Sequence, residues 1–174
     1  MRASILICIL LLLAGQGIEE TLGQEENDYW PSWRGPLATG EAPNADPPTE
    51  WDEATNVKWK IELEGLGHST PVVWEQHLFL TTAIPFGDEF EPRFSGAPGA
   101  HDNLPVSQEH KFVGMAINRD NGEVLWSKTL HQATPHEGAH ISASLASASP
   151  VTDGKHVYFW FGSYGLYCLD FEGK

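Results

Sequence analysis

The sequence predicts an all-β protein built as an array of small four-stranded antiparallel sheets. One pattern occurs twice: Ser69 to Val73 followed by His77 to Leu80, and Ser149 to Gly154 followed by His156 to Phe159. Such self-similarity is typical of repeat architectures. The 17 glycines, 12 prolines and seven tryptophans favour a turn-rich β protein. No stretch of ten or more residues keeps a helical apolar spacing, so we expect few or no helices after the N-terminus.

Residues 1–23 are expected to be an export signal. Arg2 precedes an apolar run from Ile5 to Ala14, which is too short to span a bilayer, and small residues come after it. We expect cleavage near Gly17 or Gly23 and a periplasmic or extracellular protein with no transmembrane segment after the signal. The alternative of a retained N-terminal anchor stays open. No cysteine stands where lipidation would need one.

Loss of the signal removes Cys8 and leaves Cys168 as the only cysteine, so no disulfide forms within the chain. Cys168 lies in an apolar run and is expected to be a small buried strand residue. The formal net charge of −14 argues against nucleic acid and anionic membrane surfaces as partners, because both require basic patches.

Residues 24–56 form a polar segment rich in proline and tryptophan. A segment of this composition cannot build a core alone, so the aromatic residues between Tyr29 and Pro36 are expected to pack on the surface of the downstream part of the chain. The first strand is expected over 57–63. Strands over 69–74 and 77–83 come next, joined as a hairpin by Glu75 and Gln76.

The region 84–110 carries several prolines and glycines without strand periodicity and is expected to be a long insertion, a kind of loop that is usually functional or disordered. Strands over 111–118 and 123–130 come next, around the turn 118–122. A second irregular stretch, 131–148, precedes strands over 149–152, 156–162 and 165–170, with Asp153-Gly154 as a hairpin turn.

Internal alignment turns these elements into a four-stranded unit. Gly114 to Trp126 matches Gly165 to Lys174, and Val57 to Lys60 matches Val124 to Lys128. The strand at 57–63 would then be the fourth strand of a preceding sheet. A β-propeller that closes by pairing strands from both termini explains such an isolated outer strand, so 57–174 is interpreted as a partial propeller with an insertion at 84–110.

At these residues the chain resembles the pyrroloquinoline-quinone-like (PQQ-like) β-propeller repeat family. The family unit reads Ser-x-Pro-Val, then Val-Tyr, then Gly-x-Leu-Tyr-x-Leu-Asp, and Ser149 to Lys174 fits it almost throughout. Ser69 to Trp126 fits at both ends. The segment Trp30 to Pro36 resembles the start of exported, planctomycete-type members.

The resemblance implies a propeller of seven or eight blades, of which this chain would hold about two as the N-terminal part of a longer protein. Such a piece leaves strand edges and apolar sheet faces unpaired, so we expect no stable monomeric fold from it alone. Quinoprotein dehydrogenases of the superfamily carry a vicinal disulfide and a calcium site. The chain has no Cys-Cys pair.

Histidines and acidic residues give the candidate chemistry. Four histidines, His68, His131, His136 and His140, lie in or beside connecting segments. The spacing of His136 and His140 makes a metal pair only on a helix, which the surrounding sequence does not predict, so no metal site is predicted. The acidic run 88–91 with Asp102 and Asn103 could ligate calcium, but it lacks a fixed ligand register and is better explained as a solvated loop.

Trp59 and Trp126 are interpreted as aromatics that pack between blades. The leading functional hypothesis is therefore an exported propeller that serves as an interaction or scaffold platform for other envelope or extracellular proteins, with no catalytic residues and no cofactor evident. The alternative is a PQQ-dependent alcohol or sugar dehydrogenase, with PQQ and calcium held downstream of residue 174. A third possibility is carbohydrate binding through Trp30 and Trp33.

Overall fold

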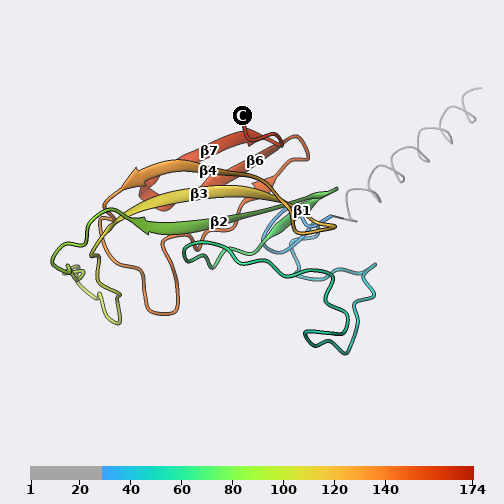
Figure 1. Cartoon of the computed structure of the whole chain (residues 1–174), viewed down its shortest axis with the longest axis horizontal. Coiled ribbons are helices and arrows are strands. Elements are labelled where there is room, and N and C mark those ends of the chain that lie inside the picture. Colours follow the sequence, from blue (N-terminus) through green and yellow to red (C-terminus); the bar gives the residue numbers. More distant parts are fainter. Residues whose placement is uncertain (1–28) are drawn as a thin grey trace, which may run out of the picture.

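The fold consists of two antiparallel sheets, seen in a computed structural model that describes residues 29–174 (Figure 1). The predicted export signal lies outside the described residues. Within them, the one helical element is the 3-10 turn Gly162–Tyr164, so the all-β prediction is confirmed. No helix among residues 29–174 is long and apolar enough to cross a membrane.

The first sheet has four strands in consecutive order: β1 (Val72–Trp74), β2 (His77–Phe86), β3 (Glu109–Asn118) and β4 (Val124–Ala133). The second sheet has three, again in consecutive order: β5 (Val151–Thr152), β6 (His156–Trp160) and β7 (Leu166–Asp170). The predicted hairpins are present at all three turn signals. Gly122 and Gly154 take φ values of 76° and 85° there, which glycine adopts without strain.

Several sequence predictions of strand boundaries need correction. β4 continues to Ala133, which pairs with His110, so residues 131–133 of the expected irregular stretch 131–148 belong to a strand. Residues 57–63 form no strand, because no described segment offers them a hydrogen-bonding partner. The ladder between β2 and β3 continues through Ile84↔Lys111 to Phe86↔Glu109, so residues 84–86 and 109–110 belong to strands. The irregular part of the expected 84–110 insertion is therefore 87–108.

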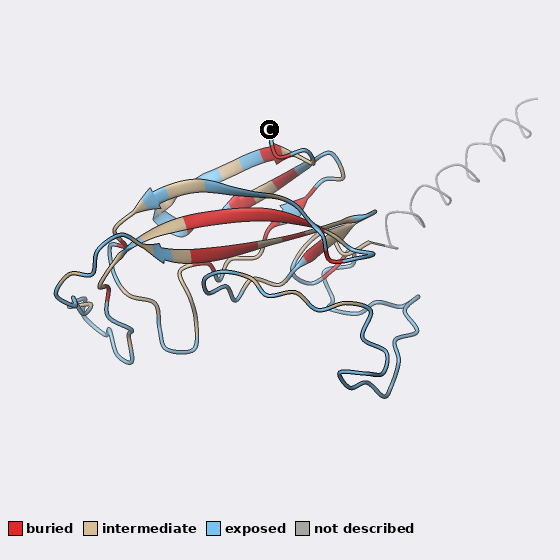
Figure 2. Cartoon of the chain, viewed as in Figure 1, coloured by how far each residue is buried: buried red, intermediate tan, exposed pale blue. Residues whose placement is uncertain are grey.

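The core lies between the two sheets and on the opposite face of the first sheet. Figure 2 shows its buried residues along the middle of β2 and β3. Phe79, Phe112 and Phe159 are almost fully buried between the sheets. On the opposite face, side chains of the extended segment 57–63 cover β3; the residues in contact are Trp59, Ile61 and Leu63 with Val113, Met115 and Ile117.

Trp59 and Trp126 make the same contact at two places. The Trp59 Nε1–H donates to the Arg119 carbonyl at 2.8 Å, and its ring lies where a Cβ on Gly122 would be 2.8 Å away. The Trp126 Nε1–H donates to the Phe171 carbonyl at 2.8 Å, and its ring lies 3.0 Å from a Cβ built on Gly173. Each indole thus packs onto the turn of the neighbouring sheet, as expected for packing aromatics.

The aromatic residues of the N-terminal segment pack only in part. Trp30 exchanges two backbone hydrogen bonds with Val73, and the Tyr29 ring lies 5.0 Å from that of Trp74. Trp33 and Trp51 are 65% and 70% exposed. The expectation that the aromatics between Tyr29 and Pro36 dock on the rest of the chain therefore holds for Tyr29 and Trp30, whereas Trp33 stays largely exposed beside the downstream residues.

Cys168 is exposed, which corrects the prediction of a buried thiol. It lies opposite Tyr158 on the face of the second sheet that points away from the first. Nothing in the described chain covers that face, so an apolar neighbourhood in sequence does not bury the side chain.

Candidate functional site

Two long connections meet beyond the strands of the first sheet. One is the β2–β3 loop, 87–108, and the other is the β4–β5 connection, 134–150 (Figure 1). The Leu104 N–H donates to the Ala139 carbonyl at 2.9 Å, and the Ile141 N–H donates to the Asp102 carbonyl at 2.9 Å. A Cβ on Gly138 would lie 1.6 Å from the Leu104 carbonyl oxygen, so only glycine permits this approach.

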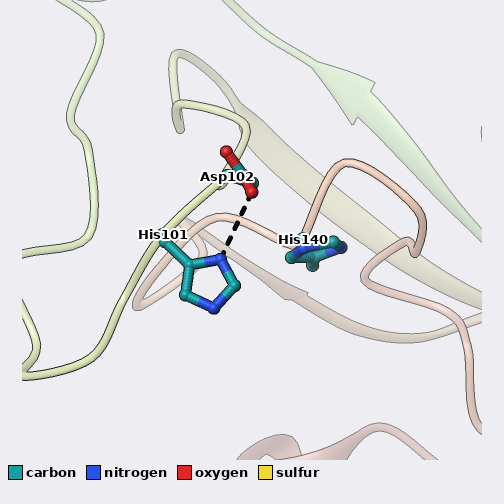
Figure 3. Close-up of side chains that lie close together, drawn as sticks. All are labelled: His101, Asp102 and His140. Carbon is teal, nitrogen blue, oxygen red and sulfur yellow. Dashed lines mark hydrogen bonds and ion pairs between the residues drawn. The ribbon is translucent and has the colours of Figure 1, made fainter.

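His101, Asp102 and His140 come together where the loops cross (Figure 3). One ligand atom from each residue lies within 4.8 Å of those of the other two. His101 Nδ1 is 3.3 Å from Asp102 Oδ2, and the two imidazole rings lie edge to face with centroids 5.8 Å apart. All three side chains lie at the surface, so a dissolved ion can reach them.

Ser142 holds the His140 ring in place. Its Oγ lies 2.8 Å from His140 Nδ1, and its backbone nitrogen lies 3.2 Å from the same ring nitrogen. Two imidazole nitrogens and one carboxylate oxygen are a ligand set suited to Zn²⁺ and related transition metals. The chemistry that this cluster offers is therefore metal coordination.

The sequence patterns linked two of these residues to other partners. They paired His140 with His136 and grouped Asp102 with the acidic run 88–91. In the described chain neither His136 nor that run belongs to the cluster. His101 was missed, because its partner His140 is distant in sequence and no local spacing links the two loops.

His131 and His136 instead pack around Tyr164. The His131 ring stacks on that tyrosine with centroids 4.9 Å apart, and the His136 ring meets it nearly edge-on at 4.7 Å. The Tyr164 hydroxyl accepts the His136 backbone N–H at 2.8 Å, and burial raises the pKa of the phenol. His131, in β4, and His136, in the β4–β5 connection, thus pack against the 3-10 turn that joins β6 and β7.

An open pocket of about 430 Å³ lies beside Trp33 and Trp160. Its lining comprises Trp33, His68, Thr70, Ser147, Ala148, Ser149 and Trp160. His68 is anchored by its backbone N–H, which donates to the Ala146 carbonyl at 3.1 Å. Trp30 does not line this pocket, because its backbone bridge to Val73 places it elsewhere.

The aromatic walls of this pocket suit a flat ring, but they do not suit PQQ. That cofactor carries three carboxylates, and a buried or half-buried carboxylate requires a cationic partner. Among the described residues that line the pocket there is no lysine or arginine. The lining of this pocket therefore supplies no cationic partner for a quinone carboxylate, and we derive no reaction step through that cofactor.

Comparison of the chain with protein-family models, curated proteins and solved structures finds no match. The function of the chain is therefore inferred from its own residues.

Proposed function

We propose that this chain is an exported, PQQ-like β-propeller protein whose blades form a platform for interaction with other envelope or extracellular proteins. Two consecutive-order antiparallel sheets packed face to face support this proposal, as does the tryptophan-on-turn contact that occurs at both sheets. Propellers stack sheets of this kind around an axis, each against the next.

One observation carries the proposal: a face that is buried in the first sheet is bare in the second. Pairing joins Val72 to Phe79 and Phe79 to Ala116, and all three are 0% exposed against the second sheet. The second sheet has a corresponding row of paired residues across its three strands, in which Val151 pairs with Tyr158 and Tyr158 pairs with Cys168.

This matching row is open to solvent. Val151 is 44% exposed, Cys168 is exposed and Tyr158 is half-buried. Further along the same face, Trp160 and Leu166 pair with each other and are 56% and 66% exposed. We call these five residues the bare face.

A third sheet of the same kind is the occupant that fits the bare face. It would pack on the second sheet in the way that the second sheet packs on the first. It would thereby bury the side chains of the bare face. Each large apolar side chain so buried contributes roughly 1.5–3 kcal/mol. Because the bare face joins several such residues, the covered state is strongly favoured.

Thiol labelling of Cys168 tests this proposal. We expect rapid modification at low concentration in the purified 174-residue chain that carries Cys8→Ser, in which Cys168 is the only thiol. In the exported protein, labelled in its native envelope, we expect protection that denaturant removes. Ser163→Cys in a Cys168→Ser background is the matched control, since Ser163 is exposed and lies outside the bare face. Equally fast labelling of Cys168 in both preparations would contradict the proposal.

Carbohydrate binding at the pocket of Trp33 and Trp160 is a second candidate function. Two exposed indoles give apolar walls, and Thr70, Ser147 and Ser149 supply polar groups. The Trp160 Nε1–H donates to the Gly162 carbonyl at 3.0 Å, which fixes the ring. Sugar rings pack their C–H faces on aromatics and bond through their hydroxyls, so this arrangement suits a glycan.

Glycan titration followed by tryptophan fluorescence tests this second candidate. Trp33→Ala should abolish the signal change, whereas Trp51→Ala, which removes an equally exposed indole in another loop, should leave it intact. The two proposals also differ for Trp160: a covering sheet shields it from acrylamide quenching in the exported protein, and a glycan site leaves it accessible.

A further inference from the structure

We propose that His101, Asp102 and His140 bind a divalent transition metal, with Zn²⁺ as the best fit, and that the ion ties the β2–β3 loop to the β4–β5 connection. This site departs from the sequence prediction of no metal centre. It is independent of the platform proposal, because it uses neither the bare face nor the propeller assignment.

The ligand atoms are already close to coordination geometry. They lie within 4.8 Å of one another, whereas ligand atoms about 2.0–2.2 Å from a tetrahedral Zn²⁺ are about 3.4 Å apart. His101 and Asp102 are 76% and 66% exposed at the side chain, so small rotations can close the remaining gap without disturbing a core. Three protein ligands leave a fourth position for water.

The backbone under the cluster is fixed independently of any ion. The hydrogen bonds from the Leu104 N–H to Ala139 and from the Ile141 N–H to Asp102 form a short antiparallel bridge beside the three side chains. Gly138 allows that bridge, since any larger residue would collide with Leu104. The metal ligands are therefore brought together by the fold and do not depend on chance contact of free loops.

The contacts of the His140 ring also suit a metal. Ser142 Oγ, 2.8 Å from His140 Nδ1, can accept a hydrogen bond from that nitrogen in the tautomer whose Nε2 is free to bind the ion. The Ser142 backbone N–H, 3.2 Å from His140 Nδ1, can donate to this nitrogen only in the tautomer whose Nδ1 carries no proton. Metal binding through Nε2 would favour the tautomer with the proton on Nδ1. The net charge of −14 further favours the approach of cations.

Zinc titration of the tag-free, chelator-treated full chain tests the site. Competition with a zinc-sensitive dye should show one Zn²⁺ per chain, and His101→Ala, Asp102→Asn and His140→Ala should each weaken binding at least about tenfold. His136→Ala is the matched control, because it removes a histidine from the same connection but outside the cluster; it should bind as the parent does.

Two further readouts distinguish loss of the site from loss of the fold. Co²⁺ should give the intense visible absorption of a tetrahedral N/O site in the parent and in His136→Ala, and Zn²⁺ should slow proteolysis within 87–108 and 134–150. Far-UV circular dichroism establishes that each variant keeps its sheets. The proposal is overturned if His140→Ala binds Zn²⁺ as tightly as the parent, or if His136→Ala lowers binding as much as His140→Ala does.

Discussion

The two sheets contain similar apolar patterns, yet they bury them differently. In the first sheet the middle strands β2 and β3 are covered on both faces, one by the second sheet and the other by Trp59, Ile61 and Leu63. The second sheet is covered on one face, where Trp126 packs on Phe159 within the core that both sheets share. Coverage by a neighbour, and not the alternation within a strand, therefore decides which apolar side chains become core.

The largest expected effect is a difference in the free energy of unfolding between alanine substitutions of two adjacent residues on opposite faces of β6. Phe159 is 0% exposed and Trp160 is 56% exposed. Phe159→Ala should lower the free energy of unfolding by about 3–5 kcal/mol, because it opens a cavity between the sheets. Trp160→Ala should cost under about 1 kcal/mol. Denaturant unfolding of both variants at one fixed protein concentration measures the difference, and equal losses would show that the bare face is covered in solution.

An intermediate loss of stability is expected from a substitution in the turn that Trp59 covers. Gly122→Ala places a methyl group 2.8 Å from the Trp59 ring at a φ of 76°. We expect about 2–5 kcal/mol of destabilisation, since overpacking adds about 1–3 kcal/mol to the backbone strain of a left-handed residue, about 1–2 kcal/mol.

Gly40→Ala is the control for that turn, because Gly40 has a φ of 85° and no atom within 4 Å of the added Cβ. This variant should lose only the free energy of unfolding that the backbone strain costs, about 1–2 kcal/mol. If thermal melts of the two variants coincide, the indole of Trp59 does not hold this turn. The comparison thus measures how firmly 57–63 covers the first sheet.

The smallest effect is expected at the turn between β5 and β6, where Asp153 caps the chain. Its carboxylate accepts the backbone N–H groups of His156 and Lys155 at 2.7 and 2.9 Å, which hold its pKa well below the usual range. The stabilisation is present above the unfolded-state pKa near 3.8 and is lost as pH falls toward the folded-state value.

Asp153→Asn should therefore melt at a lower temperature than the parent at neutral pH, and the gap should close as the pH falls below about 3.9. The hydrogen bond from the Tyr158 hydroxyl to the same carboxylate raises the pKa of that phenol to about 12. In Asp153→Asn the last step of the tyrosinate absorbance titration should move to lower pH. A gap in melting temperature that stays constant from neutral to strongly acidic pH would contradict the role of the charge.

Most strands could be predicted from the sequence, because their signals are local. Asn118 to Gly122 and Asp153-Gly154 specify tight turns through residues that tolerate positive φ, and these turns determine which strands pair. The strand at 57–63 could not be predicted correctly, since a β ladder needs a partner strand and the amino acids of one segment do not reveal whether a partner is present.

The candidate site was less predictable than the fold. His140 drew attention through its spacing to His136, but the neighbours that count are His101 and Asp102 in another loop. Irregular loops carry no periodicity from which distance can be inferred. Gly138, which permits the close approach of the two loops, was the remaining sequence signal for the site. One glycine among 17 does not stand out.

The sequence by itself determined the all-β class and the three hairpin turns, because each depends on side chains and backbone angles close together along the chain. The packing role of Trp59 and Trp126 was predicted from their repeated position, but their partners lie 60 and 45 residues away in sequence. Only the tertiary structure decided that Cys168 is exposed, that 57–63 covers a sheet without joining it, and that His101, Asp102 and His140 meet. These three outcomes depend on which surfaces and loops come into contact, and such contacts join residues that no local pattern connects.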